Sequence, residues 1–160
     1  SRQVGRGDLF AALRGATFDG TAFVASAEAR GAVAVLTGSE LETSLPQLVV
    51  SDDRAALGPV AHALHGDPTS EIAVVGITGT NGKTTAAWLL EQGLRALGQT
   101  PALLGTVASR AAQETQLQPS AFTTPEADDF ARFAAECVRA GSSHLVMEVS
   151  SHGLTQHRTG

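Results

Sequence analysis

Apolar positions along the first part of the chain occur in short runs that alternate with amphipathic stretches. Runs at residues 9–13 and 32–36 predict two β-strands, and residues 21–30 between them have the spacing of a helix that Gly31 would end. A third short run lies at residues 48–50, and side-chain oxygens that favour a helix start follow it. The pattern predicts a small unit in which strands alternate with helices.

A break in this pattern separates two predicted domains. The helix that starts at about Asp53 runs to about His65, and the sequence Gly66-Asp67-Pro68 then interrupts it. We therefore expect an N-terminal domain at residues 1–68 and a second domain at residues 69–160.

The second domain opens with a continuous apolar run at residues 72–77, which is typical of a strand covered on both faces. An amphipathic helix is expected at residues 83–97, with Gly98 as its end, and another strand at residues 101–106. Residues 108–120 have weak periodicity and indicate a loop or an irregular hairpin. The predicted apolar face of the helix consists of Ala86, Leu90, Gly93, Leu94 and Leu97.

The last part of the chain predicts a helix followed by a buried strand. Thr123, Thr124 and Pro125 supply an N-cap and a first-turn proline for a helix at residues 126–140, and residues 145–149 form the final apolar run. Because no further strand is predicted after this run, we expect it to lie at an exposed edge of the sheet. The alternation along the whole chain predicts an α/β fold with mostly parallel strands.

Composition and charge narrow the class of protein. The chain has 160 residues, of which 42% are hydrophobic, so it can bury a globular core. Its 11 Lys and Arg against 16 Asp and Glu give a net charge of -5, which provides no basic surface for nucleic acid. No apolar run has the length of a membrane span, and no leader-like segment is seen, so we expect a cytoplasmic protein without membrane insertion. The single cysteine, Cys137, excludes a disulfide framework and lies on the apolar face of a predicted helix.

The strongest functional motif lies between the apolar run at residues 72–77 and the helix after it. The segment reads Gly76-Ile77-Thr78-Gly79-Thr80-Asn81-Gly82-Lys83-Thr84-Thr85. Glycines let successive backbone N–H groups point at one spot, and the helix N-terminus adds partial positive charge, which is typical of a phosphate-binding loop. Lys83 would contact nucleotide phosphates and the Thr84 hydroxyl would coordinate Mg²⁺. The spacing departs from the usual P-loop pattern, since Ile77 stands where that pattern has its first glycine.

A second polar group follows the final predicted strand. In open α/β sheets, ligands bind beyond the carboxyl ends of the strands, and the phosphate loop and Glu148 are both expected there. Glu148 is therefore a candidate Mg²⁺ ligand, and an ion pair with a nearby arginine is the alternative. The spacing of His152 and His157 favours contacts to substrate or phosphate over metal binding. Trp88 lies off the predicted apolar face of its helix. Its side chain is therefore expected either to pack at a contact between domains or to pack on the surface.

The phosphate loop resembles the ATP loop of the Mur ligase superfamily, which also includes folylpolyglutamate and cyanophycin synthetases. One branch of this superfamily extends UDP-N-acetylmuramoyl-L-alanyl-D-glutamate. The N-terminal part of the chain resembles the uridine-binding domain of that branch at Ser1-Arg2, Gly7-Asp8-Leu9-Phe10, Gly15 and Asp19-Gly20. Its substrate-binding segments are similar to Thr123-Thr124-Pro125-Glu126 and to the run from Met147 through Arg158. The resemblance covers nearly the whole chain. It implies a small uridine-binding α/β domain followed by part of a P-loop domain.

The resemblance also implies the roles of individual residues. Thr84 and Glu148 would hold Mg²⁺, and Lys83 and Glu148 would be catalytic. The ATP-binding residues would be Gly79, Thr80, Asn81, Gly82, Lys83, Thr84 and Thr85. The substrate-binding residues would be Ser1, Thr123, Thr124, Ser150, Gln156 and Arg158, with Ala16, Thr17 and Phe18 also facing the uridine.

Members of this branch phosphorylate a substrate carboxylate with ATP, and the amine of meso-diaminopimelate or L-lysine attacks the acyl phosphate. The resemblance therefore implies ATP, Mg²⁺, UDP-N-acetylmuramoyl-dipeptide and a diamino acid as ligands of an amide ligase. A non-catalytic ATP-binding module and another superfamily ligase, such as a folylpolyglutamate synthetase, remain open as alternatives. The family's carbamylated lysine segment and its C-terminal domain have no counterpart in the sequence. We therefore expect a fragment that binds ligands without turning them over.

Overall fold

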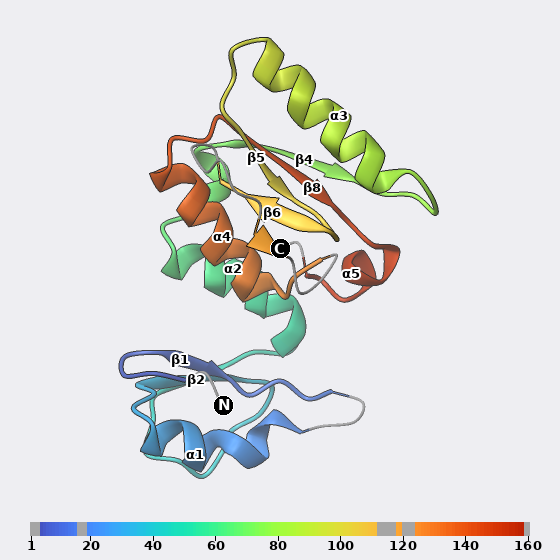
Figure 1. The fold of residues 1–160 in the computed structure, drawn as a ribbon. Helices are drawn as coiled ribbons and strands as arrows, with labels where there is room; N and C mark the ends of the chain where they lie inside the picture. The colour runs from blue at the N-terminus through green and yellow to red at the C-terminus, as the bar shows by residue number, and fades with distance from the viewer. Residues whose placement is uncertain (1–3, 16–18, 112–117, 120–123, 159–160) are drawn as a thin grey trace. The chain divides into compact units, whose positions relative to one another are not determined.

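A computed structural model describes residues 4–15, 19–111, 118–119 and 124–158 of the chain (Figure 1). The chain divides into two compact units, Ser1–Leu57 and Gly58–Gly160. This division falls inside helix α2 (Asp53–Leu64), before the interruption at Gly66 where the sequence places its boundary.

The first unit is a three-stranded parallel sheet with a helix on one face (Figure 1). Its strands are β1 (Leu9–Ala11), β2 (Ala34–Thr37) and β3 (Gln47–Val49), in that spatial order. A 3-10 turn (Gly20–Phe23) leads into helix α1 (Val24–Ala29), and Gly31 follows the helix with a φ of 101°. The core of this unit consists of Phe10, Ala12, Val24, Ala27, Ala32 and Val35. The predicted alternation of strands and a helix is therefore confirmed for this part of the chain.

The second unit is a five-stranded sheet between two helices (Figure 1). The strands lie in the order β4-β8-β5-β6-β7. Strands β4, β8 and β5 are parallel to one another, β6 is antiparallel to β5, and β7 is antiparallel to β6. The strand bounds are β4 (Ala73–Ile77), β5 (Pro101–Leu104), β6 (Ala108–Arg110), β7 (Gln118–Pro119) and β8 (His144–Glu148). The helix bounds are α3 (Lys83–Ala96), α4 (Ala127–Arg139) and α5 (Ser151–Thr155), and a 3-10 turn lies at Pro68–Ser70. The predicted α/β class with mostly parallel strands is confirmed.

Strands β5 and β8 are buried on both faces because α3 and α4 cover opposite sides of the sheet. Successive side chains of a strand point to opposite faces. Leu103 and Val146 therefore pack with Ala87 of α3, while their neighbours pack against α4. The core on the α4 side includes Ala102, Leu104, Phe130, Ala134, Cys137, Leu145 and Met147. The fully buried Cys137 thus has the core position that its spacing predicts.

Two expectations about the edges of this sheet are wrong. Among the described strands β4 pairs with β8 alone, and Val74 of β4 is 38% exposed, although its apolar run predicts cover on both faces. The strand at residues 145–149, which we expected at an exposed edge, lies between β4 and β5 and is buried. An apolar run shows that both faces of a strand tolerate burial, but it carries no information on the order of strands in a sheet.

The buried face of α3 differs from the predicted apolar face. Leu90 and Leu94 are partly buried as expected, but Leu97 is 78% exposed, and the fully buried positions are Ala87 and Glu91. The buried face is thus rotated about the helix axis relative to the predicted one. The hydrophobic pattern did not predict this because a charged residue occupies the centre of the buried face. Trp88 packs against the same cluster as Ala87, so it belongs to the core of this unit.

Two local features also differ from the sequence pattern. The N-cap of α4 is Glu126, without a side-chain cap bond, so Thr124 and Pro125 precede the cap. A short helix, α5, follows the last strand and was not predicted from the sequence; Ser150 caps it by accepting a hydrogen bond from the backbone N–H of Gly153. The weakly periodic segment after β5 contains β6 and β7, which agrees with an irregular hairpin.

Candidate functional site

The phosphate loop and Glu148 lie at the same edge of the second sheet. Strands β4 and β8 are parallel and paired so that Gly76 lies opposite Met147 and Ile77 opposite Glu148. The backbone N–H of Val149 donates to the carbonyl of Ile77 at 2.8 Å, which holds the two strand ends together. The carboxyl ends of both strands thus open on one site, as the parallel arrangement predicts.

The loop between β4 and α3 has the backbone geometry of an anion-binding turn. Gly79 and Gly82 have φ values of 146° and 80°, which side-chain-bearing residues rarely adopt. Gly82 is the N-cap of α3 and has no side chain with which to cap the helix. The Nζ of Lys83 donates to the carbonyl of Gly79 at 2.7 Å, so the lysine side chain folds back across the loop. Backbone donors and an ammonium group thus gather at the helix N-terminus, where an anion is stabilised.

Glu148 is buried at the end of β8 and is held by two threonines. Its carboxylate, in a residue only 1% exposed, accepts a hydrogen bond from the Thr84 hydroxyl at 2.9 Å. The backbone N–H and the hydroxyl of Thr106 each donate to it at 3.0 Å. Gly105 lies against it so closely that an added Cβ would be 2.5 Å from Glu148 Oε1. The structure therefore brings Thr84 and Glu148 together.

Thr106 is a site residue that the sequence analysis missed. It follows β5, whose Leu104 pairs with Met147 of β8, so its position beside Glu148 follows from the strand register. The signal available in the sequence was a Gly-Thr pair directly after an apolar strand run, at the edge where ligands bind.

The donor set at this edge fits a magnesium nucleotide. The hydroxyl of Thr84 and the carboxylate of Glu148 are hard oxygen donors of the kind that Mg²⁺ prefers, and Mg²⁺ commonly keeps waters and phosphate oxygens as its other ligands. Within the described residues, no three side chains of His, Cys, Asp or Glu gather into a metal site. A divalent cation at Glu148 would therefore depend on phosphate, hydroxyl or water oxygens.

Four of the predicted substrate-binding residues form a connected network in the second unit. The hydroxyl of the buried Thr124 accepts from the backbone N–H of Ser150 at 2.9 Å. Arg158 donates to the Gln156 side chain at 2.6 and 2.9 Å and to the Thr124 carbonyl at 3.3 Å, and it forms an ion pair with Glu126 at 3.1 Å. The segment after β8 is thereby attached to the start of α4. Four predicted substrate residues come together in this way, namely Thr124, Ser150, Gln156 and Arg158.

The other predicted contact residues, and the histidine at the start of β8, are distributed differently. Ser1, Thr123 and residues 16–18 lie outside the described residues. His152 is exposed on α5, and His157, with a φ of 52°, follows that helix. The Nδ1 of His144 lies 2.8 Å from the Ser143 hydroxyl at the opposite end of β8, away from the site.

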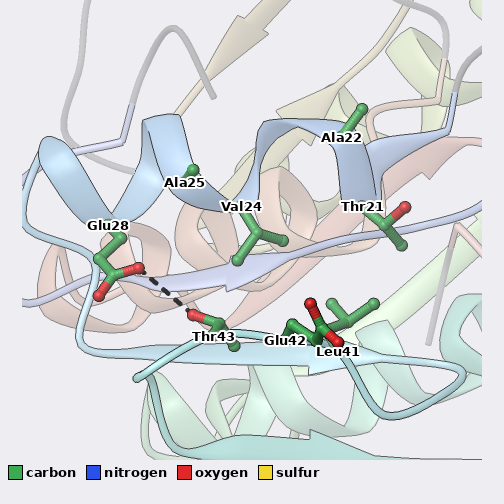
Figure 2. Close-up of a pocket in the computed structure, with 8 residues that line it drawn as sticks. All are labelled: Thr21, Ala22, Val24, Ala25, Glu28, Leu41, Glu42 and Thr43. Atoms are coloured by element: carbon green, nitrogen blue, oxygen red, sulfur yellow. Dashed lines mark hydrogen bonds between the residues drawn. The ribbon is translucent and has the colours of Figure 1, made fainter.

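The first unit contains a surface pocket of about 260 Å³ between α1 and the segment after β2 (Figure 2). Glu28 lies at one end, and its carboxylate accepts hydrogen bonds from the hydroxyls of Thr43 and Ser44. The pocket is lined by Thr21, Ala22, Val24, Ala25, Glu28, Leu41, Glu42 and Thr43. Thr124, Ser150, Gln156 and Arg158, the described residues with a predicted substrate contact, do not line it.

No helix in the described part of the chain is both long enough and apolar enough to span a membrane.

Comparison with known proteins links this geometry to one family. The chain is 40% identical over 158 residues to a UDP-N-acetylmuramoyl-L-alanyl-D-glutamate--2,6-diaminopimelate ligase from Aquifex aeolicus, with 99% of the chain and 32% of the relative covered. It is 47% identical over 157 residues to a UDP-N-acetylmuramyl-tripeptide synthetase from Deinococcus radiodurans, with 95% and 32% covered. The chain therefore spans about a third of the length of the curated relatives it matches.

The fold agrees with the sequence comparison. A solved UDP-N-acetylmuramoyl-L-alanyl-D-glutamate--2,6-diaminopimelate ligase superposes with a TM-score of 0.79 at 25% identity, covering 98% of this chain and 32% of that one. The family model described as the Mur ligase family, catalytic domain, matches residues 1–64. The model described as the Mur ligase middle domain matches residues 77–160, which include the phosphate loop from Gly79, Thr106 and Glu148. The chain belongs to the Mur ligase family.

Proposed function

We propose that this chain provides the nucleotide-binding and part of the substrate-binding machinery of an ATP-dependent amide ligase in peptidoglycan precursor synthesis. The ligase would add meso-diaminopimelate or L-lysine to UDP-N-acetylmuramoyl-L-alanyl-D-glutamate in the cytoplasm. The observation that carries the proposal is the hydrogen bond between Thr84 of the phosphate loop and the buried Glu148. The names of the relatives, which specify a diaminopimelate ligase and a tripeptide synthetase, support the substrate class.

In this proposal the phosphate loop holds ATP by backbone and ammonium groups. The ammonium group of Lys83 already lies over the loop, where an anion would bind. On ATP binding it would exchange its hydrogen bond to the Gly79 carbonyl for one to a phosphate oxygen. The ATP-binding residues are proposed to be Gly79, Thr80, Asn81, Gly82, Lys83, Thr84 and Thr85. Because such groups are fixed before the ligand arrives, they stabilise developing negative charge without reorganisation.

Thr84 and Glu148 are the proposed Mg²⁺ ligands. Magnesium bound to ATP supplies charge neutralisation for phosphoryl transfer. Three hydrogen bonds from Thr84 and Thr106 orient the Glu148 carboxylate for this role. The proximity of Glu148 to the phosphate loop favours this role over the alternative of an ion pair with an arginine.

The segments at α4 and α5 are proposed to bind the muramoyl-peptide, while the first unit binds its uridine nucleotide. Arg158 offers a guanidinium for a carboxylate or phosphate, and its present ion pair with Glu126 would exchange for that anion. The two domains are proposed to comprise residues 1–68 and 69–160. The proposed substrate-binding residues are Ser1, Thr123, Thr124, Ser150, Gln156 and Arg158.

Isothermal titration of the chain with ATP, with and without Mg²⁺, tests the nucleotide part of this proposal. We expect binding that Mg²⁺ strengthens in the wild type and that Glu148→Gln makes independent of Mg²⁺. Arg132→Gln is the matched control, because the ion pairs of Arg132 with other described residues are exposed and lie within α4. Absence of ATP binding by the folded wild type would overturn the proposal.

A further inference from the structure

A buried carboxylate on α3 joins this helix to the strand hairpin that carries Thr106. The side chain of Glu91 is fully buried, and its Oε1 accepts hydrogen bonds from the guanidinium groups of Arg95 and Arg110. Its Oε2 accepts from Gln92 at 2.6 Å. Burial alone would raise the pKa of Glu91, but the hydrogen bonds from Arg95 and Arg110 outweigh it and keep the pKa below its usual range. Glu91 is therefore an anion held inside the unit.

The two arginines that contact Glu91 belong to different elements. Arg95 is on the same helix, and it also donates to the Pro101 carbonyl at the start of β5, 3.1 Å away. Arg110 ends β6, and its Nη2 donates to Glu91 at 2.6 Å. The bond from Arg110 thus joins α3 to β6, whereas the bond from Arg95 stays within α3.

Strand β6 is short and depends on few backbone bonds. It pairs with β5 through Leu103 opposite Arg110 and Leu104 opposite Ser109, and on its other side with the two residues of β7. The turn between β5 and β6 carries Thr106, whose N–H and hydroxyl both donate to Glu148. Helix α3 is therefore linked to this hairpin in two places: Thr84 and Thr106 both donate to Glu148 of β8, and Glu91 binds Arg110 directly.

The Glu91–Arg110 pair is not explained by stability alone. Replacement of a buried ion pair by well-packed apolar residues is often neutral or stabilising, because both charges lose their hydration. The Nε of Arg110 is buried and has no hydrogen-bond partner among the described residues, which adds a further cost. The pair instead fixes the position of β6, since a planar guanidinium bound to a buried carboxylate holds its strand in one place.

We propose that Glu91 and Arg110 are positioning residues for the magnesium site: their ion pair holds the β5–β6 turn so that Thr106 orients the Glu148 carboxylate. The metal-binding part of this inference rests on the function proposed above. The geometric part does not, because it concerns only contacts within the chain. Groups that orient a metal ligand typically affect metal affinity by roughly 10–100-fold.

Amide hydrogen exchange of the 160-residue chain tests the geometric part directly. In Glu91→Gln, which preserves the shape of the side chain, we expect the Thr106 N–H to exchange about tenfold faster than in the wild type. The Val149 N–H, bonded to Ile77 in the same sheet, serves as the internal reference for general destabilisation. If Glu91→Gln does not fold, Arg110→Lys replaces it, because lysine keeps the charge but not the planar geometry, and the same selective increase is expected.

Arg95→Gln is the matched control. It removes a cation from Glu91 and the hydrogen bond from Arg95 to the Pro101 carbonyl at the start of β5, but it leaves the bond between Glu91 and Arg110 of β6 intact. Positioning by the ion pair predicts that Thr106 exchange and Mg²⁺ dependence change in Glu91→Gln and not in Arg95→Gln. Equal changes in both variants, or acceleration of Val149 and Thr106 by the same factor, would show a merely structural charge cluster and overturn the inference.

Titration with ATP and Mg²⁺ then connects the geometry to the site. We expect Glu91→Gln to raise the half-saturating Mg²⁺ concentration about tenfold while ATP affinity without Mg²⁺ stays at the wild-type value. An unchanged Mg²⁺ requirement in a variant with accelerated Thr106 exchange would overturn the positioning role and leave the proposed function intact. A wild type that binds no ATP would overturn the proposed function, and with it the metal-binding part of the inference.

Discussion

Substitution of Gly105 by alanine should disturb the Glu148 carboxylate without straining the backbone. Gly105 does not have a positive φ, so alanine is compatible with its conformation. The new Cβ would nevertheless lie 2.5 Å from Glu148 Oε1 and 3.5 Å from the Ala108 carbonyl. Because Glu148 is buried and bound by Thr84 and Thr106, the carboxylate can move away only by giving up some of these hydrogen bonds.

The magnitude follows from these contacts. Overpacking of a buried position costs about 1–3 kcal/mol, and a hydrogen bond to a charged group contributes about 1.5–3 kcal/mol. If the carboxylate stays in place, the variant is overpacked, and if the carboxylate moves, it loses a hydrogen bond, so the two costs do not add. We therefore expect Gly105→Ala to lower the free energy of unfolding by about 1–3 kcal/mol. The displaced carboxylate should also raise the Mg²⁺ concentration needed to support ATP binding, by roughly tenfold.

Urea denaturation measures the first effect and calorimetric titration measures the second. Gly93→Ala is the matched control, since Gly93 is an exposed position inside α3 where an added Cβ meets nothing within 4 Å. Alanine favours a helix interior over glycine by roughly 0.5–1 kcal/mol, so this variant should be slightly more stable than the wild type and should bind ATP normally. If Gly105→Ala matched the wild type in both assays, the close approach of Gly105 to Glu148 would not constrain the site.

Three further predictions concern other parts of the chain. Lys83→Ala should weaken ATP binding at least tenfold by calorimetry, because a charged hydrogen bond to phosphate contributes about 1.5–3 kcal/mol; an unchanged affinity would contradict the role of the loop. UDP should bind the chain without competing with ATP in ligand-detected NMR, and competition for one site would contradict the assignment of uridine to the first unit. Burial lowers the pKa of His62, with nearby His65 adding to and Asp67 opposing this effect. The unfolded chain then binds more protons at this position, so the free energy of unfolding should fall as the pH drops below about 6.5, and His62→Gln should lose less stability over that range in parallel urea titrations.

The sequence alone predicted most of the helices and strands and the meeting of the main candidate site residues. The order of strands and helices, the helix start at Lys83 and the buried position of Cys137 follow from local periodicity and from glycine and proline at the ends of elements. The meeting of the phosphate loop with Glu148 was also predictable, because the carboxyl ends of parallel strands share one edge of a sheet.

The tertiary structure decided what depends on residues far apart in the chain. Strand order places β8 inside the sheet and β4 at its edge, and an apolar run looks the same in either position. The contacts of Thr106 with Glu148 and of Glu91 with Arg110 depend on strand register and on the rotation of α3 about its axis. Local sequence patterns report which residues prefer burial, whereas the partner of a buried polar group is set by the packing of whole elements against one another.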